Sequence, residues 1–533
     1  MTRLRCSPWI GRSLLLLLLC VPGCIYVFRS VAIDPVDLRA DSVQIRSATK
    51  AHLKDGSTIV YRHGVLVLHD TLRGAGVLHS ITAGSSDLAR DSRIPVSDVA
   101  AMESFHTQVN ASRSLLVSAA ATAAVVAILA ASLAASDCCS CPVVYSDSAG
   151  TMVLDAEPFP NSVAPLFEQR DIQRLQAKAD AHGIVRLDVR NDAIETHDFN
   201  HVELLEARHA PDEQVMPDWG DKAHRLVAVR DIAEPTRVVD RSGRDVRTSL
   251  VRDDTLVFRT AVGTIDRARI DDFGDHIDIT AQAPAGVDSA ALVFTMKNSL
   301  LTTMLLYEMM MAERGWRSLD WLSEDMSQIG RAVELGKWYS SRMGMDVAVW
   351  RNGGWDHAVH MPNAGPIAWR RVATVIPVPP GDTLRVRLSF VADQWRIGSV
   401  ALASRVRAVK PRHIPLAAVI GPEGDESKEA LRDMRAPDAK YYETHPGEHF
   451  TALFDVGQLP SEGVPQRESA RTFVLASQGF YTEWLRTDWI RGARTTQPFQ
   501  PSDSTLVAAL RRWSLAKDSL EKHIGVARGG PHP

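Results

Sequence analysis

The sequence predicts a mainly β protein with some α-helix. It comprises a small N-terminal β-barrel-like unit, an alanine-rich hydrophobic helix, and β-sandwich domains with an inserted methionine-rich helical segment. Most of the chain consists of short runs in which polar and apolar residues alternate, and glycine-rich turns separate these runs, as in antiparallel sheets with one solvated face. A helix is expected where a leucine- and methionine-rich stretch lacks glycine and proline, as at 298–314. A chain of 533 residues is too long for one hydrophobic core, so we expect several domains.

The N-terminus has the features of an export signal. Arg3, Arg5 and Arg12 precede a leucine run at 14–19, and this run is too short for a comfortable membrane span. The residues that end at Cys24 resemble the bacterial lipobox, which implies cleavage before Cys24 and attachment of diacylglycerol to its thiol. An uncleaved anchor and a conventionally cleaved signal are the alternatives. We therefore expect residues 1–24 to be a signal with a lipidation site.

Residues 31–105 are predicted to form the small β domain. The pair Asp55-Gly56 lies between two alternating runs, and Asp-Gly in this position is a strong hairpin signal because glycine accepts the positive φ of tight turns. The alternating runs occur at 43–45, 58–61 and 65–68. Four histidines are scattered over this unit, and we expect them at the surface rather than around a metal. They are His52, His63, His69 and His79.

A hydrophobic segment at 114–136 divides the chain. The twenty-one residues from Leu115 to Ala135 carry no charge, and at about 1.5 Å per residue a helix of this length can cross a bilayer. Ten of them are alanine, which is close to neutral for membrane insertion. Two interpretations stay open. Either the helix spans the membrane and separates the two parts of the chain, or it is buried or lies against the membrane with both parts outside.

Three cysteines follow this segment, at Cys138, Cys139 and Cys141, and the sequence contains none after them. A zinc site would need a fourth ligand nearby, so we expect a local disulfide or a structural role and no metal. An exported location would allow these thiols to pair. The cysteines therefore favour the interpretation with both parts outside.

The C-terminal region is expected to contain two β units, with helices between and after them. Charged residues at alternate positions indicate strands, whereas the polar stretch 168–175 is expected to be a short helix or a loop. Residues 298–314 are rich in leucine and methionine and lack proline and glycine, which predicts a helix that packs in the core. The expected units are a β-sandwich domain at 140–290, a helical segment at 291–345, a second β-rich domain at 346–490 and a C-terminal helix at 500–525.

The sequence contains no nucleophile elbow, zinc-binding helix motif, P-loop or dinucleotide-binding glycine loop. Asp155 and Glu157 would project to one face of a strand, as paired catalytic carboxylates do, but Pro158 indicates that the strand ends there. The acidic run at 271–278 lacks the loop spacing of an EF-hand and is expected to be a polar turn. His445 and His449 cannot share a helix face because Pro446 and Gly447 separate them. We expect no catalytic residue, metal or cofactor.

Four tryptophans of the second β unit suggest the alternative of a carbohydrate-binding surface. Exposed tryptophans stack on sugar rings, whereas tryptophans in a β domain are more often packed inside. These residues are Trp350, Trp355, Trp369 and Trp395.

Several motifs occur in order after the hydrophobic segment. They are Ser140-Cys141-Pro142-Val-Val-Tyr145, Asp155-Ala-Glu157-Pro158, Asn191-Asp-Ala-Ile-Glu195-Thr196 and, further on, Trp350-Arg-Asn-Gly-Gly-Trp355. This order resembles an uncharacterised family of bacterial envelope lipoproteins, in which an SCPxVY…DxEP hairpin opens a β-rich domain. The likeness covers roughly residues 140–490. It implies an exported β-rich protein and no particular reaction.

We therefore predict a membrane-anchored bacterial envelope protein, periplasmic or facing the outer membrane, that acts as a non-catalytic binding or assembly module. Its partners would be the membrane and an envelope protein or a glycan. Sixty basic and 64 acidic side chains without a long run of one sign argue against a nucleic-acid surface. The alternative function is that of a carbohydrate-binding or carbohydrate-processing envelope protein.

Overall fold

The structure is a computed structural model that describes most of the chain between Arg29 and Ala527. The signal with Cys24, the hydrophobic segment 114–136 and the three later cysteines lie outside the described residues. The mainly β fold class with some helix is confirmed. The described residues are 29–35, 42–55, 57–68, 70–79, 85–90, 92–109, 142–148, 151–220, 225–251, 257–259, 273–318, 329–457, 470–485 and 499–527.

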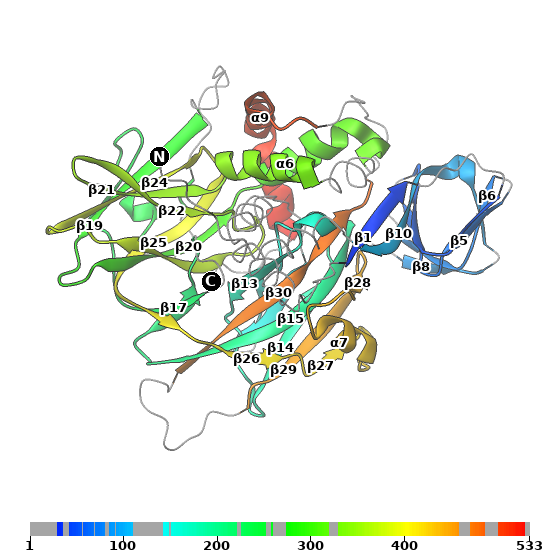
Figure 1. Ribbon diagram of the computed structural model, residues 1–533, viewed down its shortest axis with the longest axis horizontal. Coiled ribbons are helices and arrows are strands. Elements are labelled where there is room, and N and C mark those ends of the chain that lie inside the picture. Colours follow the sequence, from blue (N-terminus) through cyan, green and yellow to red (C-terminus); the bar gives the residue numbers. More distant parts are fainter. Residues whose placement is uncertain are drawn as a thin grey trace, which may run out of the picture.

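The small N-terminal domain consists of two antiparallel sheets around a core of its own (Figure 1). Gly64, with φ of +82°, lies where the chain passes from one sheet to the other, and a Cβ there would come within 2.1 Å of the Ile45 carbonyl oxygen, so only glycine fits. The first sheet runs β1 (Arg29–Pro35), β10 (Val99–Val109), β3 (Ala48–Leu53), β4 (Thr58–Tyr61), β7 (Gly76–His79), β8 (Ser85–Leu88). The second runs β2 (Ser42–Ile45), β5 (Val65–Leu68), β6 (Thr71–Arg73), β9 (Arg93–Pro95), with η1 (Val96–Asp98) after it.

The sandwich next to the small domain, here called the proximal sandwich, has two antiparallel sheets (Figure 1). Its first sheet runs β12 (Thr151–Ala156), β11 (Val143–Ser148), β14 (Ile184–Arg190), β29 (His449–Asp455), β27 (Ala418–Ile420). Its second runs β13 (Gln169–Arg174), β30 (Ala470–Glu483), β15 (Glu195–His209), β26 (Arg412–Pro415), and β28 (Tyr442–Thr444) also pairs with β15. The short helix η2 (Pro165–Phe167) precedes β13.

The distal sandwich lies on the far side of the proximal one from the small domain (Figure 1). Its first sheet runs β16 (Gln214–Pro217), β17 (Leu226–Ala233), β25 (Trp395–Val409), β20 (Ser289–Asn298), β23 (Arg370–Pro377). Its second runs β18 (Arg237–Asp240), β19 (Gly274–Gln282), β24 (Thr383–Val391), β21 (Met345–Arg351), β22 (Gly354–Met361), and η3 (Arg247–Ser249) follows β18. Residues from the facing surfaces of the two sheets pack into one hydrophobic core.

The division of the C-terminal region differs from the one expected. The sequence suggested one β domain at 140–290 and another at 346–490, but the distal sandwich, at 214–409, is inserted between two halves of the proximal one. The polar stretch 168–175, expected to be a helix or a loop, instead contains β13, which pairs with β30. Alternation along a run identifies a strand but not its partner, and β13 is polar because it lies at the junction of the two sandwiches.

A helical layer covers the upper side of the junction in Figure 1. Met304, Met309, Met310 and Met311 are buried in the same core as the proximal sandwich, so the methionine-rich helix packs as expected. No helix in the described ranges is both long and apolar enough to cross a membrane. Among the described residues this layer comprises α4 (Leu301–Met304), η5 (Leu305–Met311), η6 (Ala312–Arg317), α6 (Ile329–Arg342) and α9 (Asp503–Ala527). The helix α7 (Lys428–Met434) lies elsewhere, at the lower right of Figure 1 beside β27 and β28.

A buried polar clamp joins the two sandwiches. Glu157, just after β12, accepts hydrogen bonds at Oε2 from the backbone amides of Ile367 (2.9 Å) and Ala368 (3.0 Å). Arg370 at the start of β23 donates from both Nη atoms to Asp171 of β13, at 2.9 and 3.0 Å. Both partners of this ion pair are almost fully buried. The clamp fixes the segment that leads into β23 against the proximal sandwich.

We predict that Arg370→Ala lowers the apparent free energy of unfolding in urea by about 3–5 kcal/mol, because it leaves the buried Asp171 carboxylate without its partner. Arg342→Ala is the matched control. It removes a bidentate pair with Asp503 of similar geometry, at 2.8 and 2.7 Å, but partly exposed, which should be worth only about 0.2–1 kcal/mol. Equal losses in the two variants would contradict a role for the clamp in joining the sandwiches.

Candidate functional site

The two carboxylates that the sequence pairs do not face a common substrate site. Asp155 accepts hydrogen bonds from Ser146 Oγ (2.6 Å) and from the backbone amides of Gln176 (2.8 Å) and Ala177 (3.1 Å). Burial raises the pKa of Asp155 above its ordinary value, and these hydrogen bonds oppose that shift. Glu157 belongs to the clamp, where its Oε2 accepts hydrogen bonds from the backbone amides of Ile367 and Ala368. Both side chains therefore organise backbone segments.

The four tryptophans have three different environments. Trp395 is buried, and its Nε1 donates to the carbonyl of Gly344 at 3.1 Å. Trp350 and Trp355 face each other across the β21–β22 hairpin with ring centroids 5.2 Å apart, and the guanidinium of Arg385 lies 4.6 and 5.4 Å from their centroids. The two indoles meet edge to face, and with Arg385 they form a cross-strand packing unit. Trp369 is the tryptophan that borders a cleft.

The other acidic and histidine candidates are also accounted for. Asp271 and Asp272 lie outside the described residues, and Asp278 pairs with Arg387 at 2.7 Å. His449 is exposed, whereas His445 is buried. Within the described ranges, no three histidine, cysteine, aspartate or glutamate side chains converge as a metal site requires.

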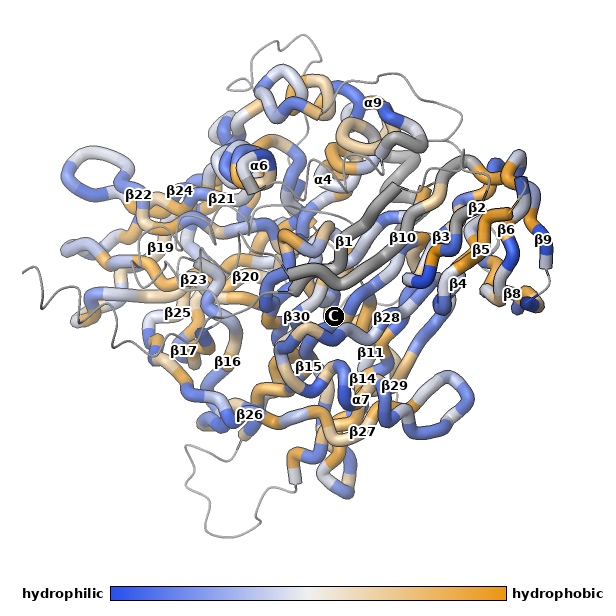
Figure 2. The backbone as a smooth tube through the Cα atoms, turned by 45° about the vertical axis from the view of Figure 1, so that its right-hand side comes forward, coloured by the Kyte–Doolittle hydropathy of each residue, from blue (hydrophilic) through white to orange (hydrophobic). Residues whose placement is uncertain are grey.

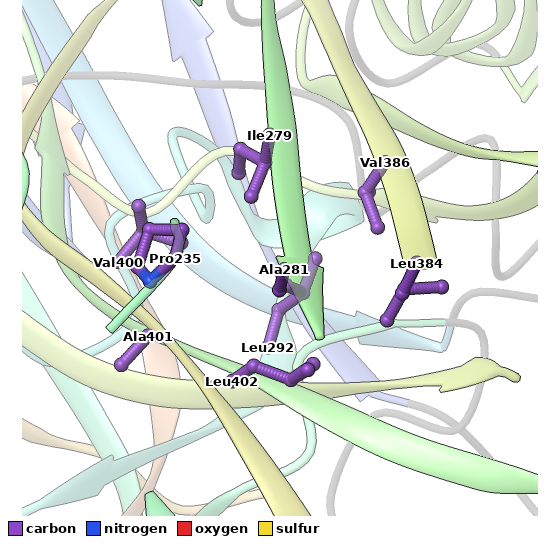
Figure 3. A pocket seen from close by; sticks show the side chains of 9 residues that line it. All are labelled: Pro235, Ile279, Ala281, Leu292, Leu384, Val386, Val400, Ala401 and Leu402. Atoms are coloured by element: carbon purple, nitrogen blue, oxygen red, sulfur yellow. The ribbon is translucent and has the colours of Figure 1, made fainter. Parts of the chain in front are cut away.

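Two hollows differ in what they could hold. One lies between the sheets of the distal sandwich, and Figure 3 shows apolar side chains pointing into it. It has no room for a water molecule, so it is a packing gap. Its lining residues are Pro235, Ile279, Ala281, Leu292, Leu384, Val386, Val400, Ala401 and Leu402.

The other hollow is a cleft of about 350 Å³ at the junction of the two sandwiches, within the size range of small-molecule sites. The proximal sandwich contributes residues of β12, β30 and the segment that follows β13, and the distal sandwich contributes residues of β20 and β23. The lining residues are Asp155, Arg174, Leu175, Gln176, Ala177, Lys178, Thr295, Trp369, Arg371, Arg471, Thr472 and Phe473.

The charge of this cleft is strongly unbalanced. Arg174, Lys178, Arg371 and Arg471 line it, against the single carboxylate of Asp155. In the part of the chain that the structure describes, none of these four cations forms an ion pair within hydrogen-bonding distance of a carboxylate. The geometry therefore suits an anionic ligand.

Sequence reasoning did not find these residues. Arg174, Arg371 and Arg471 are far apart in the chain and meet only because β13 and β30 pair while the clamp brings β23 beside them. No spacing rule connects residues on three strands. Arg174 and Lys178 are the two cleft cations that lie close together in the sequence, and no site was predicted there from the sequence.

A second polar cluster lies where the small domain contacts the proximal sandwich, beside β28 and β30 (Figure 1, Figure 2). Trp484 is at its centre, and its Nε1 donates to Thr196 Oγ1 at 2.9 Å. Four side chains surround the indole, at the following distances from its centroid: Lys50 Nζ (5.6 Å) and the rings of His52 (6.5 Å), His79 (5.2 Å) and His445 (6.1 Å).

Charged groups extend this contact. Arg62 Nη2 of the small domain donates to Glu448 Oε1 at 3.0 Å, and Lys50 Nζ donates to Thr482 Oγ1 at 3.5 Å. Burial, and next the neighbouring His445, lower the pKa of His79 to about 4. With this lowered pKa, His79 is neutral near pH 7 while the contact is formed.

Comparisons with known proteins add little. The sequence matches no family model and no curated protein. The GH31 α-xylosidase from Xanthomonas citri is 9% identical, with 84% of this chain and 32% of that chain covered and a TM-score of 0.15. A GH86 protein in complex with neoagarooctaose is 10% identical, with 44% and 33% covered and a TM-score of 0.15. This chain spans about a third of the length of each. At these TM-scores the likeness supports no conclusion about fold or function.

We predict that acid weakens the docking of the small domain. A base whose pKa is lowered on burial favours docking while it is neutral, so docking should be complete above pH 6.5 and weaken toward pH 4, by up to about tenfold per pH unit. Energy transfer between dyes on Ser86→Cys and Lys428→Cys, in a chain whose native cysteines are serines, would report it.

His79→Asn is the variant that tests this prediction, because its amide stays neutral across this pH range. Besides Trp484, the groups that face His79 are His445 and Glu448 from the β28–β29 turn, Arg62 from the turn after β4, and the ring of His52 beyond the indole. A pH profile that is the same in His79→Asn and wild type would show that another group controls docking.

Proposed function

We propose that this protein is a membrane-anchored envelope protein that binds a ligand without transforming it, with both of its β parts on the same side of the membrane. The contact around Trp484 is the observation that supports placing both parts on one side. It joins residues that precede the hydrophobic segment to residues that follow it.

A helix that crossed the bilayer once would place these two parts in different compartments. Lys50, His52 and His79 of the small domain are 3%, 0% and 7% exposed, and they lie against Trp484 of the proximal sandwich. Exposing two histidines and a lysine that are packed on Trp484 would leave an aromatic surface bare. The contact therefore supports the interpretation in which the segment at 114–136 does not separate the two parts.

A binding role is favoured over a catalytic one by the chemistry of the cleft. Its single carboxylate, Asp155, already accepts three hydrogen bonds from Ser146 and the wall of the cleft. An acid–base reaction needs a titratable group that can reach the substrate and change its proton occupancy. Arginine side chains stay charged and supply binding and orientation instead.

The carbohydrate alternative has one observation in its favour. Trp369 borders the cleft, and Gln176 and Thr295 supply neutral hydrogen-bonding groups in the same wall. An indole beside polar side chains is the usual composition of a sugar site. We therefore propose a glycan or a sugar derivative as the second candidate for the ligand.

Labelling from outside the cell tests the topology. Ser86 on β8 and Lys428 on α7 are both exposed, one on each side of the hydrophobic segment in the sequence. We expect a small maleimide that passes the outer but not the inner membrane to label Ser86→Cys and Lys428→Cys equally in intact cells.

The control is the same chain without an introduced cysteine, with Cys138, Cys139 and Cys141 replaced by serine in all three. Permeabilised cells should label both variants. If Lys428→Cys is labelled only after the inner membrane is opened, the segment spans the membrane and the proposal of a single compartment is wrong.

Lipidation at Cys24 has its own test. We expect radiolabelled palmitate to enter the wild-type protein and not the Cys24→Ala variant, because the thiol is the point of attachment. The variant should also leave the membrane fraction unless the hydrophobic segment retains it. Absence of label from wild type, with no change on substitution, would remove the lipid anchor.

A further inference from the structure

The cleft contains two arginine side chains, Arg174 and Arg371, neither of which forms an ion pair with a carboxylate of the described residues. The positive charge of Arg371 contributes to lowering the pKa of Arg174 to about 10, although burial is the larger cause. The Nε atoms of both guanidinium groups are buried and have no hydrogen-bond partner among the described residues. Two desolvated like charges side by side are unfavourable in the empty protein.

Nearby protein groups offset the repulsion between the two guanidinium groups only in part. Arg371 has one long hydrogen bond, from Nη2 to Gln214 Oε1 at 3.4 Å. Arg471 donates to the carbonyl of Gly457 at 2.9 Å rather than to a carboxylate. Asp155 lowers the repulsion at Arg174, but its oxygens are already bonded to the cleft wall. An anion bound in the cleft would supply negative charge beside these guanidinium groups.

The volume of the cleft and its lining residues indicate which class of anion it would bind. A phosphoryl group carries up to two negative charges and accepts parallel hydrogen bonds from guanidinium groups. The cleft of about 350 Å³ is larger than one such group needs, and the remaining wall holds Trp369, Thr295 and Gln176. That wall suits a neutral body with hydroxyl groups.

We propose that the cleft binds a phosphate monoester of a sugar-sized molecule, with the phosphoryl group between Arg174 and Arg371 and the sugar beside Trp369. This assignment deepens the binding role proposed above and rests on it. The same chemistry occurs in a free sugar phosphate and in a phosphorylated lipid headgroup.

Titration calorimetry on the full chain in detergent tests the assignment. Glucose 1-phosphate should bind saturably, inorganic phosphate more weakly, and glucose not measurably. Binding should weaken as salt is raised, because the charges at the mouth of the cleft are screened. Absence of saturable binding by glucose 1-phosphate would overturn the assignment.

Variants locate the site. Arg174→Gln and Arg371→Gln should each weaken binding of glucose 1-phosphate at least tenfold, whereas Arg371→Lys should fall between wild type and Arg371→Gln because it keeps the charge and loses the planar fork. Arg385→Gln is the control, since it removes a cation stacked on Trp350, which does not line the cleft.

Thermal unfolding of each variant shows whether it has folded. If either buried arginine variant fails to fold, Lys178→Gln replaces it, because Lys178 is exposed at the rim, and a several-fold loss of affinity is expected. Unchanged affinity in the folded cleft variants would place any bound phosphate elsewhere and overturn the assignment.

Two further outcomes distinguish a free sugar phosphate from a lipid headgroup as the ligand, and a binding cleft from a catalytic one. Tighter binding to phosphatidylcholine vesicles that contain phosphatidate than to glucose 1-phosphate, lost in Arg371→Gln, would support the phosphoryl site but overturn its sugar part. Release of inorganic phosphate from glucose 1-phosphate would support the site and overturn the non-catalytic function. The labelling experiment is independent of both, so failure of the topology leaves the site assignment standing.

Discussion

The clamp formed by Glu157, Asp171 and Arg370 is the interaction on which the rest of the C-terminal region depends. Buried charges are expensive unless they are paired and fully hydrogen-bonded, and here the partners come from different sandwiches. The pairing therefore selects one relative arrangement of the sandwiches. Gly365, with φ of +87°, lets the loop approach Glu157, because a Cβ there would lie 2.7 Å from Oε2. The same arrangement creates the cleft.

The clamp and the cleft lie at the same junction, but their arginine side chains differ in whether they are paired with a carboxylate. In the clamp Arg370 pairs with Asp171 through both Nη atoms, whereas in the cleft neither Arg174 nor Arg371 forms an ion pair with a carboxylate of the described residues. A buried Nε without a partner is common to all three arginines, so the ion pair is the difference between them. A folded protein retains partly buried cations without such a pair at a cost to its stability, and sites that break the local rules in this way are typically functional. The contrast distinguishes a structural network from a binding site better than residue types alone, since both use arginine.

The contact around Trp484 bears on which side of the membrane the two β parts lie. Histidines from both the small domain and the proximal sandwich surround one indole, and the charged pair between Arg62 and Glu448 lies beside them. Because the chain between these two parts contains the hydrophobic segment, a contact that buries side chains bears directly on membrane topology. The lowered pKa of His79 predicts that acid weakens this contact, which would let the two parts separate without unfolding.

The sequence by itself determined the fold class, most strands and the methionine-rich and C-terminal helices, because alternation and helical periodicity are local properties. It also predicts a signal that ends at Cys24 and a hydrophobic segment at 114–136, which lie outside the described residues. Tertiary structure decided strand partners, which made the distal sandwich an insertion and turned the polar stretch at 168–175 into β13. It likewise brought Arg174 to Arg371, and His79 to Trp484. Pairing between distant segments depends on the packing of the whole chain, so no local pattern contains it.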